Sequence, residues 1–278
     1  PSAAQEATWA KGILKVTEPN PEHWGVVAEK PSDQIELSGG WGGNGGFNPN
    51  TGQFNSGIVG TLGLSLTNFS TRNLFKGPKK GHWSPLPSGD GQRLSLRAQS
   101  NGISFQTYTF AFSEPWLGGK KPNSFSFSAN HSINNWGAFS AIPQKFTTTN
   151  LSVGLGKRLR WPDDFFSVNY GLSYIRYNLD NFSFGIPNFI ENGNSNAVEL
   201  RLGLGRYSTD DQIFPSTGST IDFSVQATPP VSLLNNKDYS TLDPQEKYKW
   251  IEYHKWKFNA AHFSTLKKNL VFHNMKAF

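Results

Sequence analysis

Apolar side chains alternate with small or polar ones in segment after segment of this chain. In residues 62–67, Leu62, Leu64 and Leu66 alternate with Gly, Ser and Thr. A repeat of two residues places the apolar side chains on one face of an extended strand. Eight segments carry the pattern clearly: 62–67, 93–99, 107–112, 124–130, 150–156, 166–174, 198–205 and 221–228. A first strand over 35–43 and weaker ones over 256–264 and 270–278 predict eleven strands in an all-β chain.

The polar face of these strands is unusual for a soluble protein. Charged side chains occupy mid-strand positions among Gly, Ser and Asn: Arg93, Arg97, Glu199, Arg201 and Asp222. Several segments also approach the ~9–11 residues with which a tilted strand crosses a bilayer, whereas strands of ~5–6 residues are usual in soluble sheets. An apolar lipid face and a wet lumen face are the pattern of a transmembrane antiparallel β-barrel.

Composition alone does not choose between a barrel and a soluble β-sandwich. Only 36% of the residues are hydrophobic and the mean hydropathy is −0.49, yet 14% are aromatic. A barrel gives such a polar average because each strand has one wet face, and the alternation favours the barrel. The sequence contains no apolar run long enough for a membrane-spanning helix. It also has no Cys, which excludes disulfides and thiolate metal sites.

An odd number of strands does not suit a complete single-chain bacterial barrel, which has an even number. We therefore expect these strands to be part of a larger barrel. Residues 1–33 are rich in Pro, Glu and Lys and lack the alternation, which is typical of the end of a soluble domain. The predicted division is a short soluble remnant over 1–33 and barrel strands over 34–278.

Several segments in order carry a resemblance to a known family: IELSGGWGG at 35–43, GTLGLSLTNFSTRNLF at 60–75, residues 88–123, and RYSTDDQIFPSTGSTIDFSVQATPP at 206–230. Over residues 29–278 the chain resembles the BamA family of outer-membrane protein assembly factors, in its Bacteroidota form. The resemblance implies a 16-stranded barrel preceded by periplasmic POTRA domains. Residues 1–33 would be the C-terminal remnant of the last POTRA domain, and the closing strands and sixth extracellular loop would follow Phe278.

The resemblance also implies a function without catalysis, the folding and insertion of other outer-membrane β-barrel proteins. The first strand would act as a lateral gate, whose edge pairs with substrate strands through the main chain. The residues implied are Gln34, Ile35, Glu36, Leu37, Ser38, Gly39, Gly40, Trp41, Gly42 and Gly43. Glycines lower strand stability, as a transiently paired strand requires; they also allow a backbone to bend at a crowded corner. Trp41 is expected at the membrane interface or against the lumen.

Partners and location follow from the same resemblance. They are the outer membrane with its lipopolysaccharide and phospholipid, nascent outer-membrane β-barrel proteins, and accessory BAM-type lipoproteins. Short lysine groups at 76–80, 120–121 and 267–268 fall in alternate connections, which would face the periplasm together with residues 1–33. They suit contacts with lipoproteins or headgroups, or are solvated turns.

Other function classes have little support in the sequence. The six His residues show no metal-ligand spacing, and no nucleophile elbow, phosphate-binding loop or dinucleotide fingerprint is present, so no enzyme, cofactor or metal is expected. The formal charge is +6 (26 − 20), but Lys and Arg are scattered, which argues against nucleic-acid binding. Two alternatives remain: a passive outer-membrane channel or translocation barrel, and a soluble carbohydrate-binding β-sandwich with exposed Trp.

Overall fold

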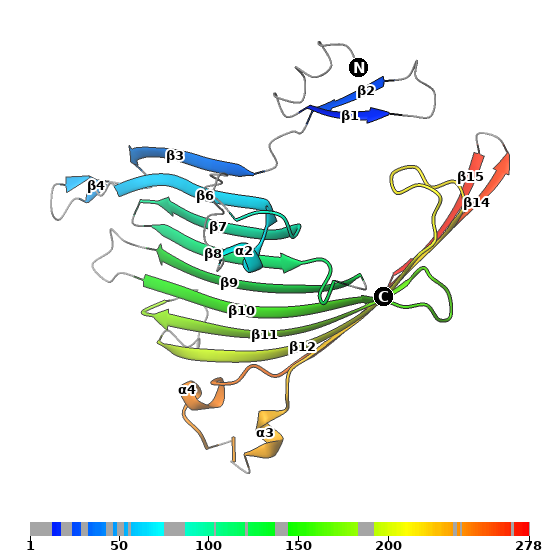
Figure 1. Ribbon diagram of the computed structural model, residues 1–278. Helices are drawn as coiled ribbons and strands as arrows, with labels where there is room; N and C mark the ends of the chain where they lie inside the picture. The colour runs from blue at the N-terminus through cyan, green and yellow to red at the C-terminus, as the bar shows by residue number, and fades with distance from the viewer. Residues whose placement is uncertain are drawn as a thin grey trace.

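The chain folds into one large antiparallel sheet. The computed structural model describes residues 33–42, 57–74, 87–119 without 103, 122–136, 144–182, and 192–277 without 236, 237, 240, 268 and 269; it also gives the backbone of four short strands at 13–17, 24–28, 47–48 and 53–54. Eleven strands pair in the order β15-β14-β13-β12-β11-β10-β9-β8-β7-β6-β3 (Figure 1). Each strand therefore pairs with its neighbour in sequence, as in an up-and-down barrel wall.

The strands of this sheet are β3 (Gln34–Gly42), β6 (Gly57–Phe69), β7 (Gln92–Asn101), β8 (Phe105–Glu114), β9 (Asn123–Trp136), β10 (Gln144–Arg158), β11 (Phe166–Asp180), β12 (Gly193–Tyr207), β13 (Gly218–Ala227), β14 (His254–Lys267) and β15 (Leu270–Ala277). β1 (Ile13–Thr17) pairs with β2 (Trp24–Ala28), and β4 (Phe47–Asn48) with β5 (Gln53–Phe54), in two small separate sheets. The helices are single turns: α2 (Thr71–Leu74), α3 (Val231–Leu234) and α4 (Pro244–Lys247).

The register turns the alternation of the sequence into two continuous faces. One row across eight strands is apolar: Ile35, Leu64, Leu96, Phe110, Ala129, Leu151, Tyr174 and Val198. On the other face, Ser128 and Ser152 share a hydrogen bond of 2.6 Å and Asn130 donates to Thr109 at 2.9 Å. We call these the apolar face and the polar face.

Almost none of the apolar face is covered. The buried hydrophobic side chains among the described residues are Leu66, Phe69, Val168, Phe182 and Ala197. Leu62, Leu200 and Tyr170 are each more than half exposed, and within the described part of the chain no second sheet packs on them. A soluble sandwich would bury such a face, whereas a membrane barrel turns it toward lipid. The fold is thus that of a transmembrane β-barrel wall, and the prediction of a soluble sandwich is not supported.

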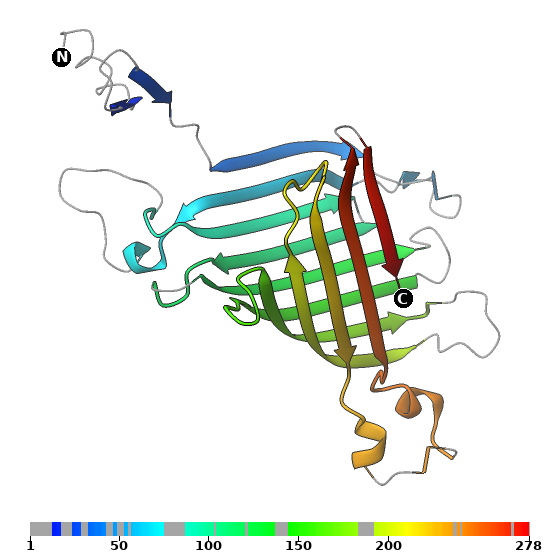
Figure 2. The same ribbon diagram turned by 90° about the vertical axis from the view of Figure 1, so that its right-hand side faces the viewer.

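The connections alternate between two ends of the sheet. The end at which β3 begins, here the near end, carries α2, residues 115–119, the turn 159–165 and the turn 208–217. The opposite, far end carries the long connection between β13 and β14, with α3 and α4 beyond the strand ends (Figure 1). Figure 2 shows the sheet curling, so that β13, β14 and β15 pass in front of earlier strands. None of the described helices is long and apolar enough to cross a membrane.

The long far-end connection is tied to the sheet where β13 is too short to pair. β12 begins at Gly193, but its pairing with β13 starts only at Leu200. Lys249 and Ile251 bond to the part of β12 that β13 does not reach. The Asn196 N–H donates to the Lys249 carbonyl at 2.8 Å, and the Ile251 N–H donates to the Asn196 carbonyl at 2.9 Å. Tyr253 then donates to Glu199 on the polar face at 2.6 Å.

All eleven predicted sheet strands are confirmed, and most are longer than predicted. β10, β11 and β12 each contain 15 residues, because Thr, Asn and Tyr at their far ends extend the strand beyond the apolar alternation. The sequence did not predict the short strands within residues 1–33, and their assignment to a POTRA remnant stays a prediction.

Candidate functional site: the open edge of β3

β3 is paired on one side only. Its nine residues match β6 from Gln34↔Ser65 to Gly42↔Gly57, and it is the last strand of the sheet on this side. Every residue from Gln34 to Trp41 is exposed, including Ile35 at 75% and Leu37 at 79%. A strand in this position leaves backbone N–H and C=O groups available for another strand. Within the eleven-stranded sheet, β15 is the other strand that is paired on one side only.

The glycines of β3 are not in crowded places. A Cβ added at Gly40 or Gly42 meets no atom within 4 Å, and at Gly39 the nearest atom is 3.9 Å away. A bend at a crowded corner therefore does not explain them, and a weakly held strand remains the better interpretation. The crowded glycine is Gly60 on β6, where a Cβ would overlap the carbonyl oxygen of Ser38. The close approach of β3 to β6 thus requires Gly60.

Glu36 reaches from β3 across β6 to β7. Glu36 lies opposite Gly63, and Gly63 lies opposite Arg97. Arg97 Nη2 is 3.4 Å from Glu36 Oε1, and the two side chains are 48% and 54% exposed. The pair forms on the polar face because Gly63 has no side chain between them; a Cβ there would be 3.2 Å from Glu36 Cβ. One charge of the edge strand is thereby tied to the second strand behind it.

The alternation predicted that Arg97 lies on the polar face, but not that it meets Glu36. Their contact depends on the register of three strands, and the glycine between them was the one available signal. Gly60 was likewise missed, because its role comes from the backbone of β3 rather than from its own strand.

The predicted site residues of β3 are divided between the two faces of the sheet. Gln34, Glu36, Ser38, Gly40 and Gly42 lie on the polar face, and Ile35, Leu37, Gly39 and Trp41 on the apolar face. Trp41 is 75% exposed beside Ile58, which agrees with an interfacial position and not with lumen packing. Gly43 and the lysines at 76–80, 120, 121 and 268 lie outside the described residues.

The arrangement offers backbone N–H and C=O groups for main-chain pairing. Within the described residues, no group of three or more His, Asp or Glu side chains is placed to hold a metal ion. A hollow of about 630 Å³ lies over the strands next to β3 on the apolar face, lined by Ile35, Leu62, Leu96, Tyr108 and Phe110 among others. This hollow is a shallow depression between side chains of the membrane-facing surface.

Comparison with known proteins identifies a family domain. Residues 88–275 match the Omp85 superfamily domain. Among solved structures, BamA from Haemophilus ducreyi lacking POTRA domains 1–3 is similar with a TM-score of 0.46 and 16% identity. The alignment covers 98% of this chain and 49% of that one, so this chain spans about half its length. A search of curated proteins finds no match.

Proposed function

Because the chain belongs to the Omp85 superfamily, an outer-membrane family, we propose that it assists the folding and insertion of other outer-membrane β-barrel proteins. The edge of Gln34–Gly43 is the lateral gate in this proposal, and the terminal strand of a substrate adds to it. No catalytic step is involved. The near end faces the periplasm, where accessory lipoproteins bind, and the lipid partners are lipopolysaccharide and phospholipid.

The observation that carries the proposal is that β3, the last strand of the sheet on its side, is exposed and rich in glycine. Main-chain pairing is generic, because each new strand uses the same N–H and C=O groups whatever its side chains. The unstrained glycines at 39, 40 and 42 reduce side-chain packing against the partner, so a substrate strand can both bind and leave. A passive channel or translocation barrel has no need of a glycine-rich, weakly packed strand at this position.

The chain contains no Cys, so single cysteines can be placed without background. We expect Ser38→Cys to form a disulfide with one position of a cysteine-scanned terminal strand of a substrate, and Glu36→Cys to shift that position by two residues. Disulfides require Cβ atoms about 4 Å apart, so the yield reports strand register. The measurement is disulfide yield on non-reducing gels during assembly of a substrate barrel.

Ser224→Cys is the matched control, since Ser224 lies on the polar face of β13 with paired strands on both sides. It should give no register-specific product. A scan of positions 34–43 without any specific crosslink would remove the gate assignment. If depletion of the protein leaves the levels of other outer-membrane barrels unchanged, the passive channel becomes the better function.

A further inference from the structure

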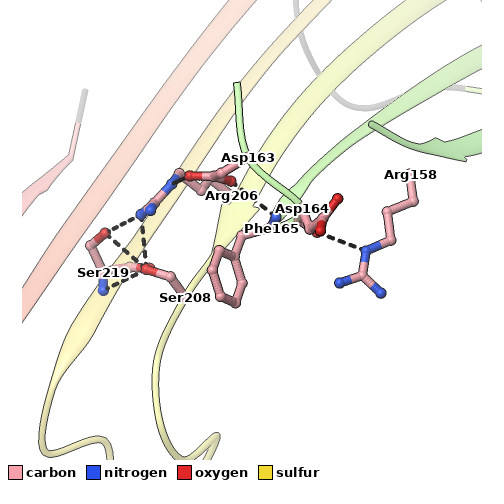
Figure 3. A network of polar contacts seen from close by, with 7 residues as sticks. All are labelled: Arg158, Asp163, Asp164, Phe165, Arg206, Ser208 and Ser219. Atoms are coloured by element: carbon pink, nitrogen blue, oxygen red, sulfur yellow. Dashed lines mark hydrogen bonds and ion pairs between the residues drawn. The ribbon is translucent and has the colours of Figure 1, made fainter. Parts of the chain in front are cut away.

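Two near-end turns beside the central strands are locked together by one arginine. Arg206 Nε donates to Asp163 Oδ2 at 2.9 Å, and Arg206 Nη1 donates to Ser208 Oγ at 2.8 Å and Ser219 Oγ at 2.7 Å (Figure 3). The guanidinium also lies 5.7 Å from the ring centroid of Phe165. The turn 159–165 is therefore fixed to the base of β12 and β13, and the charge of Asp163 is neutralised.

The end of β10 and the fixed turn that follows it present three cations around one hollow. Lys157, Arg158, Arg160 and Trp161 line a depression of about 620 Å³ at the near end, together with Pro122, Asn123, Leu159 and Asp164. Arg158 Nε is held by the carbonyl oxygen of Asp164 at 2.7 Å, as Figure 3 shows. Asp164 is the one carboxylate in this lining. Within the described residues, Lys157 and Arg160 form no ion pair, so the hollow carries net positive charge.

The hollow also lies where the membrane-facing row ends. Leu151, Val153 and Leu155 are exposed on the apolar face, and Lys157 is the next residue of the same row. Trp161 follows the strand and is 82% exposed. Basic side chains and Trp at the end of an apolar belt are the groups found at the headgroup level of a bilayer.

We propose that Lys157, Arg160 and Trp161 bind the phosphodiester headgroup of a phospholipid in the leaflet at the near end. Lys157 and Arg160 pair with the phosphate as charge-assisted donors, while the lipid chains lie along Leu155 and Val153. The apolar row favours a lipid over free phosphate, because free phosphate has no apolar part that could pack on this row. The site depends on the membrane location of the sheet and is independent of the lateral gate.

Lipid binding can be measured on the full-length protein in detergent by native mass spectrometry with added phosphatidylglycerol. Each basic residue near a lipid surface contributes about 1 kcal/mol, so removing two charges in Lys157→Gln/Arg160→Gln should weaken retention roughly fivefold per charge. Lys255→Gln/Lys257→Gln is the matched control, because it removes two charges from the polar face of β14. The control should retain lipid like the unmodified protein.

Equal lipid loss in both double variants, or in neither, would overturn the proposal. Excess inorganic phosphate should leave the bound lipid in place; if it displaces the lipid, the hollow is a free-anion site and the lipid assignment is wrong. Heat-modifiable gel mobility shows that each variant is folded. Loss of lipid binding with unchanged Ser38→Cys crosslinks would support this site, whereas loss of crosslinks alone would concern only the gate.

Discussion

Gly40 and Gly60 lie one strand apart but have opposite surroundings, and a larger side chain should affect them in opposite ways. Gly40→Val enters open space and raises strand propensity, which stabilises β3 on β6 by up to ~1 kcal/mol. Gly60→Val overlaps the Ser38 carbonyl and forces the pairing of β3 to shift. We expect Gly40→Val to give a folded barrel with slower substrate assembly, and Gly60→Val to lower the yield of folded barrel.

The measurements are heat-modifiable mobility for folding and the rate of substrate assembly in reconstituted vesicles. Assembly at the normal rate by a stabilised Gly40→Val protein would show that a weakly held β3 is unnecessary.

The Glu36–Arg97 pair should make a small, salt-dependent contribution. Both side chains are about half exposed, so a double-mutant cycle with Glu36→Gln and Arg97→Gln should give a coupling energy of only ~0.2–1 kcal/mol. High salt should reduce it, because the Debye length falls to about 3 Å at 1 M. The measurement is urea unfolding at low and high salt. A coupling that salt leaves unchanged would contradict direct ion pairing.

For single residues, the sequence predicted on which face of the sheet a side chain lies but not which side chains are in contact. Alternation alone placed Arg97 and Glu199 on the polar face and Leu62 and Leu64 on the apolar one. It could not show that Gly60 is indispensable while Gly40 is not, because that difference arises from the distance between two backbones. Register is a property of paired strands, and a single strand does not contain it.

At the scale of elements, the turn between β12 and β13 is built on two carboxylates. The Thr217 and Ser216 N–H groups donate to Asp210, and those of Phe214 and Ile213 to Asp211; these bonds lower the pKa of both side chains. A carboxylate whose pKa is lower in the folded state stabilises it fully above the unfolded value of about 3.9, and loses this effect as the pH falls through the folded value. The turn should therefore be intact at neutral pH and loosen only below about pH 4.

Hydrogen–deuterium exchange at Ser216 and Thr217, corrected for intrinsic rates, tests this. Protection should disappear in acid for the unmodified chain, and at every pH for Asp210→Ala. Asp210→Asn keeps an acceptor oxygen without the charge and should show weaker protection that does not vary with pH. Unchanged protection of the unmodified chain from neutral pH into acid would refute a role for the carboxylate charge.

Among the elements, the local sequence indicates turns but not the contacts of the long connection between β13 and β14. Adjacent acidic residues such as Asp210 and Asp211 are typical of turns, and the structure has a turn there. The long connection between β13 and β14 is rich in charged residues, yet Lys249, Ile251 and Tyr253 bond to β12. That contact follows from β13 being shorter than β12, a difference in length that is visible only once the strands are paired.

For the whole molecule, the all-β class, the eleven strands and the membrane-facing side followed from one repeat of two residues. Their order in the sheet also follows, since neighbours in sequence pair in up-and-down topologies. The curl of the sheet and the contacts that fix the near-end turns depend on how several paired strands are arranged, so a single segment of sequence does not predict them. The fixed hollow beside Lys157 therefore had no counterpart in the sequence beyond a short basic run.

The edge strand β3 is also short, with nine residues against fifteen in β10, β11 and β12. At about 3.4 Å per residue, the wall is about 30 Å long at β3 and about 50 Å long at its centre. The extra residues of the long strands are mostly Thr, Asn and Tyr at the far end, so these strands extend the wall beyond the apolar belt there. The place at which a new strand would enter is thus also a place at which the wall projects little beyond the apolar belt.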